Sequence, residues 1–173
     1  GPEDIFGVFG TCWYYRLDAY KCVKKGGDVC FAVAGENRYP VIFGGGPAWT
    51  FDEQSGQYYL HSFRSAQPDL NWRNPEVVPA MHNVLRFWLD RGVDGFRIDV
   101  VNMVMKHPVL ADNPPNPRWR EGMPDLGRFL QVNNRNYPDV FDAVRGMRRV
   151  IDEYEGRMLV GEVYGRAEEV AGY

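Results

Sequence analysis

The sequence is poor in cysteine, and the cysteines that it has form no recognisable framework. Its 173 residues include three, Cys12, Cys22 and Cys30, all within the first 30 positions. An odd number without CxxC spacing argues against a disulfide scaffold and against a cysteine-ligated zinc site. We therefore expect free thiols in a reducing compartment, and so a cytoplasmic location.

Long apolar runs and strong net charge are also missing. No run approaches the roughly 18–20 apolar residues that a transmembrane helix needs, so no membrane span is expected. The opening residues GPEDIFGVFG do not join a basic stretch to an apolar one, so no secretory signal is expected in them. A formal charge of −3 gives no electrostatic basis for binding nucleic acid or an anionic membrane.

Metal-binding and phosphate-binding patterns are absent as well. The histidines, His61, His82 and His107, have no ligand spacing and are interpreted as surface or packing residues. The glycine triplet 44–46 is followed by Pro47 and not by Lys-Ser/Thr, so it is interpreted as a flexible turn. We expect no metal and no organic cofactor.

One helix is predicted over residues 74–91. Asn74 is a candidate N-cap and Pro75 suits the first helical position, although Pro79 offers an alternative start. Apolar side chains recur at helical spacing and are expected to face the core: Met81, Leu85, Trp88 and Leu89.

A second helix is predicted from Asp139, as N-cap, to Gly156. Its apolar face comprises Val140, Val144, Met147, Ile151 and Tyr154. Each helix is followed by a short apolar segment, VDGFRI at 93–98 and RMLVGEV at 157–163, which we interpret as buried strands.

The order is helix, strand, long loop, helix, strand. The loop, residues 101–138, holds six of the 12 prolines, and connections of this length are usually functional. A strand followed by a helix and another strand forms a βαβ crossover, so the two strands are predicted to be parallel. Residues 1–60 are predicted to form short strands and loops, including strands at 29–33 and 57–63.

Two carboxylates occupy equivalent places at the ends of these strands. Asp99 and Glu162 each follow an apolar segment and precede a loop. Ligands bind at that end of parallel α/β sheets, and adjacent strands lie about 4.8 Å apart. The two carboxylates are thus expected roughly 5–5.5 Å apart, the spacing of retaining glycosidases. Arg97 would hold the charge of Asp99, while apolar neighbours are expected to raise the pKa of Glu162.

A structural interpretation competes with this one. Arg97 and Asp99 would then form a buried ion pair, and Glu162 would cap the start of a loop. The pattern of strand ends leaves both interpretations open.

Three segments resemble, in order, signature regions of the α-amylase superfamily. They are QPDLNWRNPEV (67–77), GFRIDVVN (95–102) and MLVGEVY (158–164). They look most like the α-glucosidase and oligo-1,6-glucosidase branch, which acts on short α-glucosides. The resemblance covers about residues 39–173.

The resemblance implies an α/β fold, a fragment of a (β/α)₈ TIM barrel. This chain would supply strands 4 and 5 with their helices, plus part of the domain B insertion. Residues 1–70 would belong to that insertion, although the first 38 match it poorly, and residues 71–173 would form the partial barrel. The family's other catalytic stretches, including its third carboxylate, have no counterpart in the sequence.

The resemblance also implies roles for single residues. Asp99 matches the nucleophile, Arg97 the arginine that contacts it, and Glu162 the general acid/base. Asn71 stands where calcium-dependent amylases have Asp, and as a neutral ligand it gives little support for a calcium site there. Substrate contacts are implied for Phe43, Phe63, Gln67 and Val100, the last being the residue type of members that favour α-1,6 linkages.

The implied function is retaining hydrolysis of oligosaccharide or disaccharide α-glucosides. One alternative is glucosyl transfer or isomerisation, as in trehalose synthases and sucrose isomerases. Another is a non-catalytic amylase-like module, against which the presence of both Asp99 and Glu162 argues. The isolated chain is expected to be inactive, because two barrel strands leave sheet edges open.

Overall fold

The computed structural model describes residues 16–18, 39–42, 46–54 and 56–173. They fall into two compact units: the residues up to Asn71 together with Asp112–Gln131, and Trp72–Ala111 together with Val132–Tyr173. The three cysteines, the strand predicted at 29–33 and the substrate contact implied for Phe43 lie outside the described residues. The expectation of a reducing, cytoplasmic environment stays a prediction.

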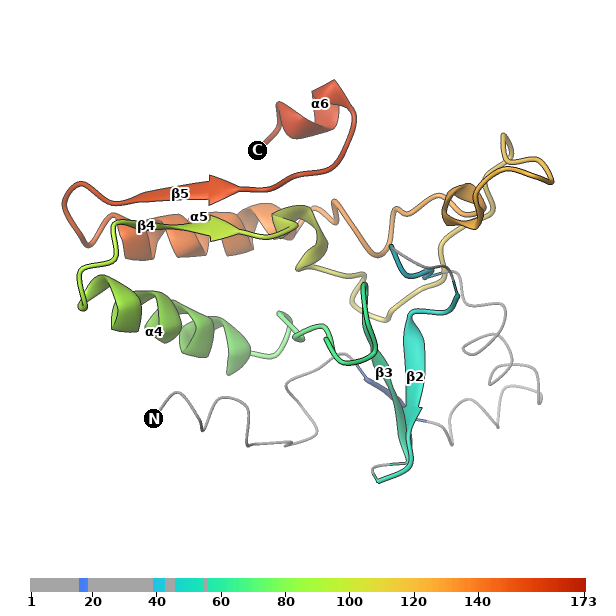
Figure 1. Ribbon diagram of the computed structural model, residues 1–173, viewed down its shortest axis with the longest axis horizontal. Coiled ribbons are helices and arrows are strands. Elements are labelled where there is room, and N and C mark those ends of the chain that lie inside the picture. Colours follow the sequence, from blue (N-terminus) through green and yellow to red (C-terminus); the bar gives the residue numbers. More distant parts are fainter. Residues whose placement is uncertain (1–15, 19–38, 43–45, 55) are drawn as a thin grey trace. The chain divides into compact units, whose positions relative to one another are not determined.

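The first unit contains a three-stranded antiparallel sheet in the order β1-β3-β2. The strands are β1 (Arg16–Asp18), β2 (Trp49–Asp52) and β3 (Gln57–Leu60), and β2 and β3 form a hairpin (Figure 1). The prediction of a strand at 57–63 is confirmed over its first four residues. A loop within Asp112–Gln131 carries the 3₁₀ turn η2 (Asp125–Gly127).

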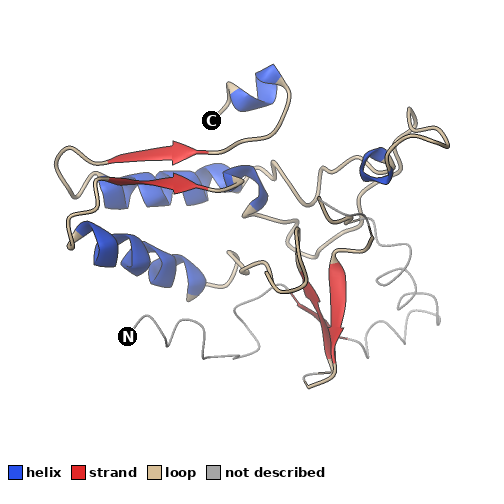
Figure 2. Cartoon of the chain, viewed as in Figure 1, coloured by secondary structure: helices blue, strands red, loops and turns tan. Residues whose placement is uncertain are grey.

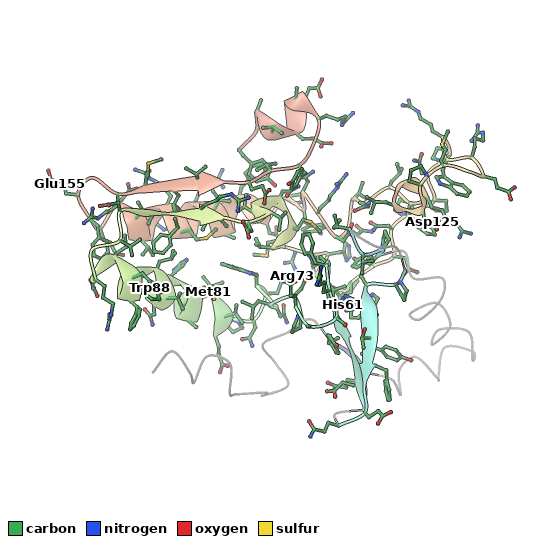
Figure 3. The ribbon with its side chains drawn as sticks, in the orientation of Figure 1. His61, Arg73, Met81, Trp88, Asp125 and Glu155 are labelled. Atoms are coloured by element: carbon green, nitrogen blue, oxygen red, sulfur yellow. The ribbon has the colours of Figure 1, made fainter. Side chains whose placement is uncertain are left out.

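In the second unit, the first predicted helix is α4, Val77–Leu89 (Figure 2). Its start is later than predicted, because Asn74 closes a turn in front of the helix, where its side chain accepts the Glu76 N–H at 2.9 Å. Pro79 is tolerated in the first turn, where main-chain N–H groups have no intrahelical acceptor. Trp88, expected in the core, lies exposed on α4 (Figure 3).

The second predicted helix is α5, Val140–Ile151. Asp139 stands at the N-cap position, but its carboxylate makes no capping bond and pairs with Arg73 at 2.6 Å instead. α5 packs against α4 and against strand β5 (Met158–Gly161). The side chains that it buries are Val140, Ala143, Met147, Val150 and Ile151.

Strands β4 (Gly95–Ile98) and β5 form a two-stranded parallel sheet, which confirms the predicted crossover. Their register pairs Gly95 with Met158 and Ile98 with Gly161. Gly95 is required at its position, since an added Cβ would collide with the Met158 carbonyl oxygen. The 3₁₀ turn η1 (Val101–Met103) follows β4, and the short helix α6 (Ala167–Val170) follows β5.

The prediction that these two strands are buried is wrong. Met158 is 57% exposed and Val160 50% exposed, and Arg97 of β4 is exposed on the same face. The physical reason is that β4 and β5 pair only with each other in the described chain, and within this unit the face that bears Met158, Val160 and Arg97 stays exposed to solvent. An apolar strand sequence indicates a covered strand, but it does not ensure that both faces are covered.

The boundary between the two units, at residues 71 and 72, lies beside the division proposed from the sequence. The first unit also includes Asp112–Gln131, which the sequence analysis placed with the barrel portion. Assignment of the first unit to domain B stays a prediction. In the described residues no helix has the length and apolar character to cross a membrane.

Candidate active site

Asp99 and Glu162 follow β4 and β5 directly, at the carboxyl edge of the parallel sheet. The ladder continues past the assigned strands, because Glu162 N–H donates to the Ile98 carbonyl at 2.9 Å. The two carboxylates therefore occupy matching positions on neighbouring strands. The register confirms the predicted placement at adjacent strand ends, while the predicted spacing of the two carboxyl groups and their roles stay predictions.

Arg97 joins the two carboxylates. Its Nη1 forms an ion pair with Asp99 Oδ1, and its Nη2 lies 3.0 Å from Glu162 Oε1. Alternate residues of a strand point to the same face, which places Arg97 beside Asp99, and the parallel register adds Glu162. The planar guanidinium presents its donors in a fixed fork that can contact both acceptors at once, whereas the donors of a lysine ammonium sit on a flexible stem without that fixed geometry.

Glu162 accepts two further hydrogen bonds. Tyr164 Oη donates to Oε1 at 2.7 Å, and Val100 N–H donates to Oε2 at 3.2 Å. The Tyr164 hydrogen bond is the main cause that lowers the pKa of Glu162, helped by Val100 N–H and by Arg97 and opposed by desolvation. The prediction that apolar neighbours raise this pKa is wrong, because three donors outweigh the surrounding apolar side chains.

Val100 has an unusual backbone conformation. Its φ of 38° and ψ of 48° lie in the left-handed region, which a β-branched residue rarely adopts. This turn aims the Val100 N–H at the Glu162 side chain, and Val101 N–H takes the main-chain bond to the Glu162 carbonyl at 3.0 Å. Nothing in the sequence indicates it, since valine favours extended backbone.

Asn102 ties together the segments that follow the two strands. It is buried, its Nδ2 donates to the Tyr164 carbonyl at 3.0 Å, and its own carbonyl accepts the Asn136 N–H at 2.7 Å. Asn102 ends the motif GFRIDVVN, but no role was predicted for it from the sequence. The signal was a polar side chain directly after an apolar run.

The site is open on the uncovered face of the sheet. The side chain of Asp99 is 72% exposed and that of Glu162 is 23% exposed. The buried ion pair that the structural interpretation required is therefore absent from this unit. Asp99 is solvated and held by Arg97, so its charge carries no burial penalty here.

The residues implied as substrate contacts lie in different units of the chain. Val100 lies at the site, where its main chain contacts Glu162. Phe63 and Gln67 lie in the first unit, in the turn segment after β3, where Gln67 N–H donates to the Arg64 carbonyl at 2.8 Å. Their substrate contacts stay predictions.

Metal ligands do not gather in the part of the chain that the structure describes: no group of three or more His, Cys, Asp or Glu side chains is placed to hold an ion. His61 is buried and pairs through Nε2 with Thr50 Oγ1 at 2.9 Å, in keeping with its interpretation as a packing residue.

The family profile described as Alpha amylase, catalytic domain matches residues 21–173. An oligo-1,6-glucosidase of Parageobacillus thermoglucosidasius is 42% identical over 133 residues, which cover 75% of this chain and 22% of that protein. The chain thus spans less than a quarter of the length of this relative.

Solved structures agree with the family match. An alpha-glucosyl transfer enzyme superimposes with a TM-score of 0.74 and 34% identity, over 90% of this chain and 28% of that one. The isomaltulose synthase of Klebsiella sp. LX3 gives a TM-score of 0.65 and 32% identity, over 90% of this chain and 24% of that one.

Proposed function

The chain belongs to the family of the alpha-amylase catalytic domain, and from that premise we propose that it is part of a retaining glycosidase acting on short α-glucosides. Curated relatives are named oligo-1,6-glucosidase and alpha-glucosidase, which supports a small α-glucoside as the substrate class. The substrate, an oligosaccharide or disaccharide, is the partner proposed for the site.

One observation carries the proposal: a single guanidinium contacts two carboxylates at the ends of adjacent parallel strands. Arg97 Nη1 meets Asp99, and Nη2 lies 3.0 Å from Glu162. Carboxylates that share one guanidinium fit the spacing of about 5–5.5 Å used by retaining enzymes better than the 6.5–9.5 Å of inverting ones. The wider spacing leaves room for a water between carboxylate and sugar, which retention does not need.

Two roles follow for the carboxylates. Asp99, solvated and paired with Arg97, is the nucleophile: its oxygen attacks the anomeric carbon and displaces the leaving oxygen, giving a covalent glucosyl-enzyme. Glu162 protonates that leaving oxygen and then takes a proton from the water that attacks the intermediate. Two displacements restore the α configuration.

Glu162 must gain a proton before it can act as an acid. In this chain its three donors lower its pKa and favour the ionised form. A bound sugar and the remaining barrel would exclude water from the open face of the sheet, and desolvation raises the pKa of a carboxyl group. The acid form is thus proposed to belong to the closed, substrate-bound site.

We assign β4 and β5 to strands 4 and 5 of a (β/α)₈ barrel. The uncovered face that bears Arg97, Asp99 and Val160 would then line the barrel interior, where the other strands cover it. The short span relative to family members supports this assignment. The chain on its own is expected to be inactive, which an assay of the isolated 173 residues with an aryl α-glucoside tests directly.

The proposal is tested in the complete enzyme that carries this chain. An activated fluorinated α-glucosyl donor, which forms the intermediate faster than water removes it, should add one glycosyl group to the peptide containing Asp99. The Asp99→Asn variant should remain unlabelled. A label on another residue, or a β-anomer as the first product of hydrolysis, would contradict the retaining mechanism.

Glucosyl transfer is the second candidate, since similar structures include an alpha-glucosyl transfer enzyme and an isomaltulose synthase. Transfer uses the same two carboxylates and replaces the attacking water by a sugar hydroxyl. Product analysis at increasing acceptor concentration separates the two: a hydrolase continues to release glucose, whereas a transferase shifts to new disaccharides.

A further inference from the structure

Tyr164 lies beside the proposed acid/base and is not itself one of the reacting groups. Its phenol donates to Glu162 Oε1 at 2.7 Å, although its ring is exposed. Its main-chain carbonyl is held by the buried Asn102, whose Nδ2 donates to it at 3.0 Å. An exposed tyrosine with an anchored backbone and a fixed acceptor is placed to orient that acceptor.

The two oxygens of Glu162 have different partners. Oε1 receives Tyr164 Oη at 2.7 Å and faces Arg97 Nη2 at 3.0 Å, whereas among the described residues Oε2 receives a single donor, the Val100 N–H, at 3.2 Å. A carboxylate oxygen offers about two acceptor positions. Both positions on Oε1 are thus occupied, and one position on Oε2 is open.

We propose that Tyr164 is a positioning residue for the acid step: with Arg97 it occupies Oε1 of Glu162 and leaves Oε2 as the oxygen that carries the proton to the leaving group. This inference rests on the proposed function, because it assigns a role within the same reaction. The proton leaves Oε2 as the glycosidic bond breaks, and both bonding electrons of that bond stay on the protonated leaving oxygen.

The charges around this carboxylate agree with the assignment. The groups that act on Glu162 in the described chain are Tyr164 on its own segment, and Arg97 and the Val100 N–H from the β4 side. Asp99 contacts the same arginine and adds negative charge near Tyr164, whose pKa is raised chiefly by its hydrogen bond to Glu162. The phenol therefore stays protonated and remains a donor.

The test compares Tyr164→Phe with the unmodified enzyme, both as the complete protein that contains this chain. Loss of the donor favours the neutral form of Glu162, so the alkaline limb of the kcat/KM profile should move to higher pH. The measured quantity is kcat/KM at a fixed pH on that limb, divided by the maximal kcat/KM of the same protein. This fraction should be about three- to tenfold larger for the variant than for the unmodified enzyme.

A second readout reports the position of the proton. A disaccharide needs a protonated leaving group, whereas an activated aryl α-glucoside does not. Tyr164→Phe should lower the ratio of kcat/KM for the disaccharide to that for the aryl substrate about three- to tenfold at the pH optimum. A residue that merely supports the fold would lower both values together.

The chain offers a matched control. Tyr154 Oη donates to Asp90 Oδ1 at 2.7 Å, the same distance and chemistry, in the segment that precedes β5 and not the one that follows it. Tyr154→Phe should leave both the pH limb and the substrate ratio unchanged. Thermal unfolding of the two variants checks that each is folded.

The outcomes are separable. If Tyr164→Phe leaves either the alkaline limb or the substrate ratio at the unmodified value, or if Tyr154→Phe changes both equally, the positioning role is wrong. If the unmodified complete enzyme turns over no α-glucoside at all, the proposed function itself is wrong, independently of Tyr164.

Discussion

The two ends of the β4–β5 sheet are built from the same kinds of polar side chain and differ in how these are shared. At the amino end, Arg157 pairs with Asp94, and Tyr154 donates to Asp90. Each acceptor there has one donor side chain among the described residues. At the carboxyl end, Arg97 forms ion pairs with both Asp99 and Glu162, and Glu162 also accepts a hydrogen bond from Tyr164.

The difference matches the roles proposed for the two ends, a structural one at the amino end and a catalytic one at the carboxyl end. The ion pair between Arg157 and Asp94 neutralises both charges, at a gain of roughly 0–1 kcal/mol for an exposed pair. A shared arginine divides one positive charge between two carboxylates, so neither has a cation of its own. The carboxyl end therefore holds groups whose charge state can respond to a ligand.

The largest expected effect comes from removing Asp99, the proposed nucleophile. In the complete enzyme, Asp99→Asn should lower kcat by about 10³-fold or more, because an amide cannot form the glycosyl-enzyme. Asp94→Asn, at the other end of the same strand, should stay within about twofold. Steady-state kinetics on one α-glucoside measures both. If Asp94→Asn lowered kcat as much as Asp99→Asn does, the proposed difference between the two ends of the sheet would be wrong.

Arginine substitution should give the next largest effect. Arg97→Met leaves Asp99 and Glu162 without their common cation, and kcat/KM should fall about 10²-fold. Arg157→Met should alter the unfolding midpoint slightly and leave kcat/KM unchanged, because Asp94 is exposed to solvent. The comparison sharpens further if Arg97→Lys recovers only part of the loss, since lysine cannot bridge two acceptors with a planar fork.

Substitution by glycine is expected to stabilise the protein at Val100 and to destabilise it at Val104. Glycine has no penalty at a φ of 38°, and relief of the left-handed valine should raise stability by about 1 kcal/mol, less the packing of the lost side chain. At Val104, whose φ is −66°, the same change to glycine should destabilise by about 1 kcal/mol. Thermal unfolding of the two variants of the complete enzyme measures the difference. A lower midpoint for both would mean that Val100 stores no backbone strain.

The smallest expected effect is on acid stability. The pKa of Glu162 is below its ordinary value in the folded state, so its stabilisation is present above pH about 4.5 and is lost as the pH falls through the lowered pKa. Glu162→Gln should flatten that acid-side loss without changing the slope at neutral pH. Unfolding midpoints measured across the acid range test this, and an unchanged slope would show that the donors of Glu162 add no pH-dependent stability.

Much of the second unit could be predicted from sequence because its signals are local. Helical spacing around Leu85 and Met147 located α4 and α5, and the crossover rule gave parallel strands ending at Asp99 and Glu162. Burial could not be predicted for Met158 and Val160, because it depends on what packs on their face of the sheet, and a local sequence pattern does not report that.

The partners of Glu162 were missed for a different reason. The Val100 N–H reaches the carboxylate through a left-handed backbone conformation. Valine disfavours this conformation, so the residue type gave no reason to expect the hydrogen bond. Tyr164 is two residues away, and its hydrogen bond depends on how the chain turns after β5. The sign of the pKa shift of Glu162 followed from these contacts and not from its apolar neighbours in the sequence.

The arginine that serves two carboxylates also constrains how this sequence can diverge. Substitution of Asp99 leaves Arg97 to Glu162 alone, which favours the ionised form of Glu162 and would weaken it in its proposed role as an acid. The effects of changes at the two positions are therefore non-additive, and the second loss costs less than the first. A descendant that loses one carboxylate has little selection left to retain the other, so inactive relatives should lack both more often than independent mutation would predict.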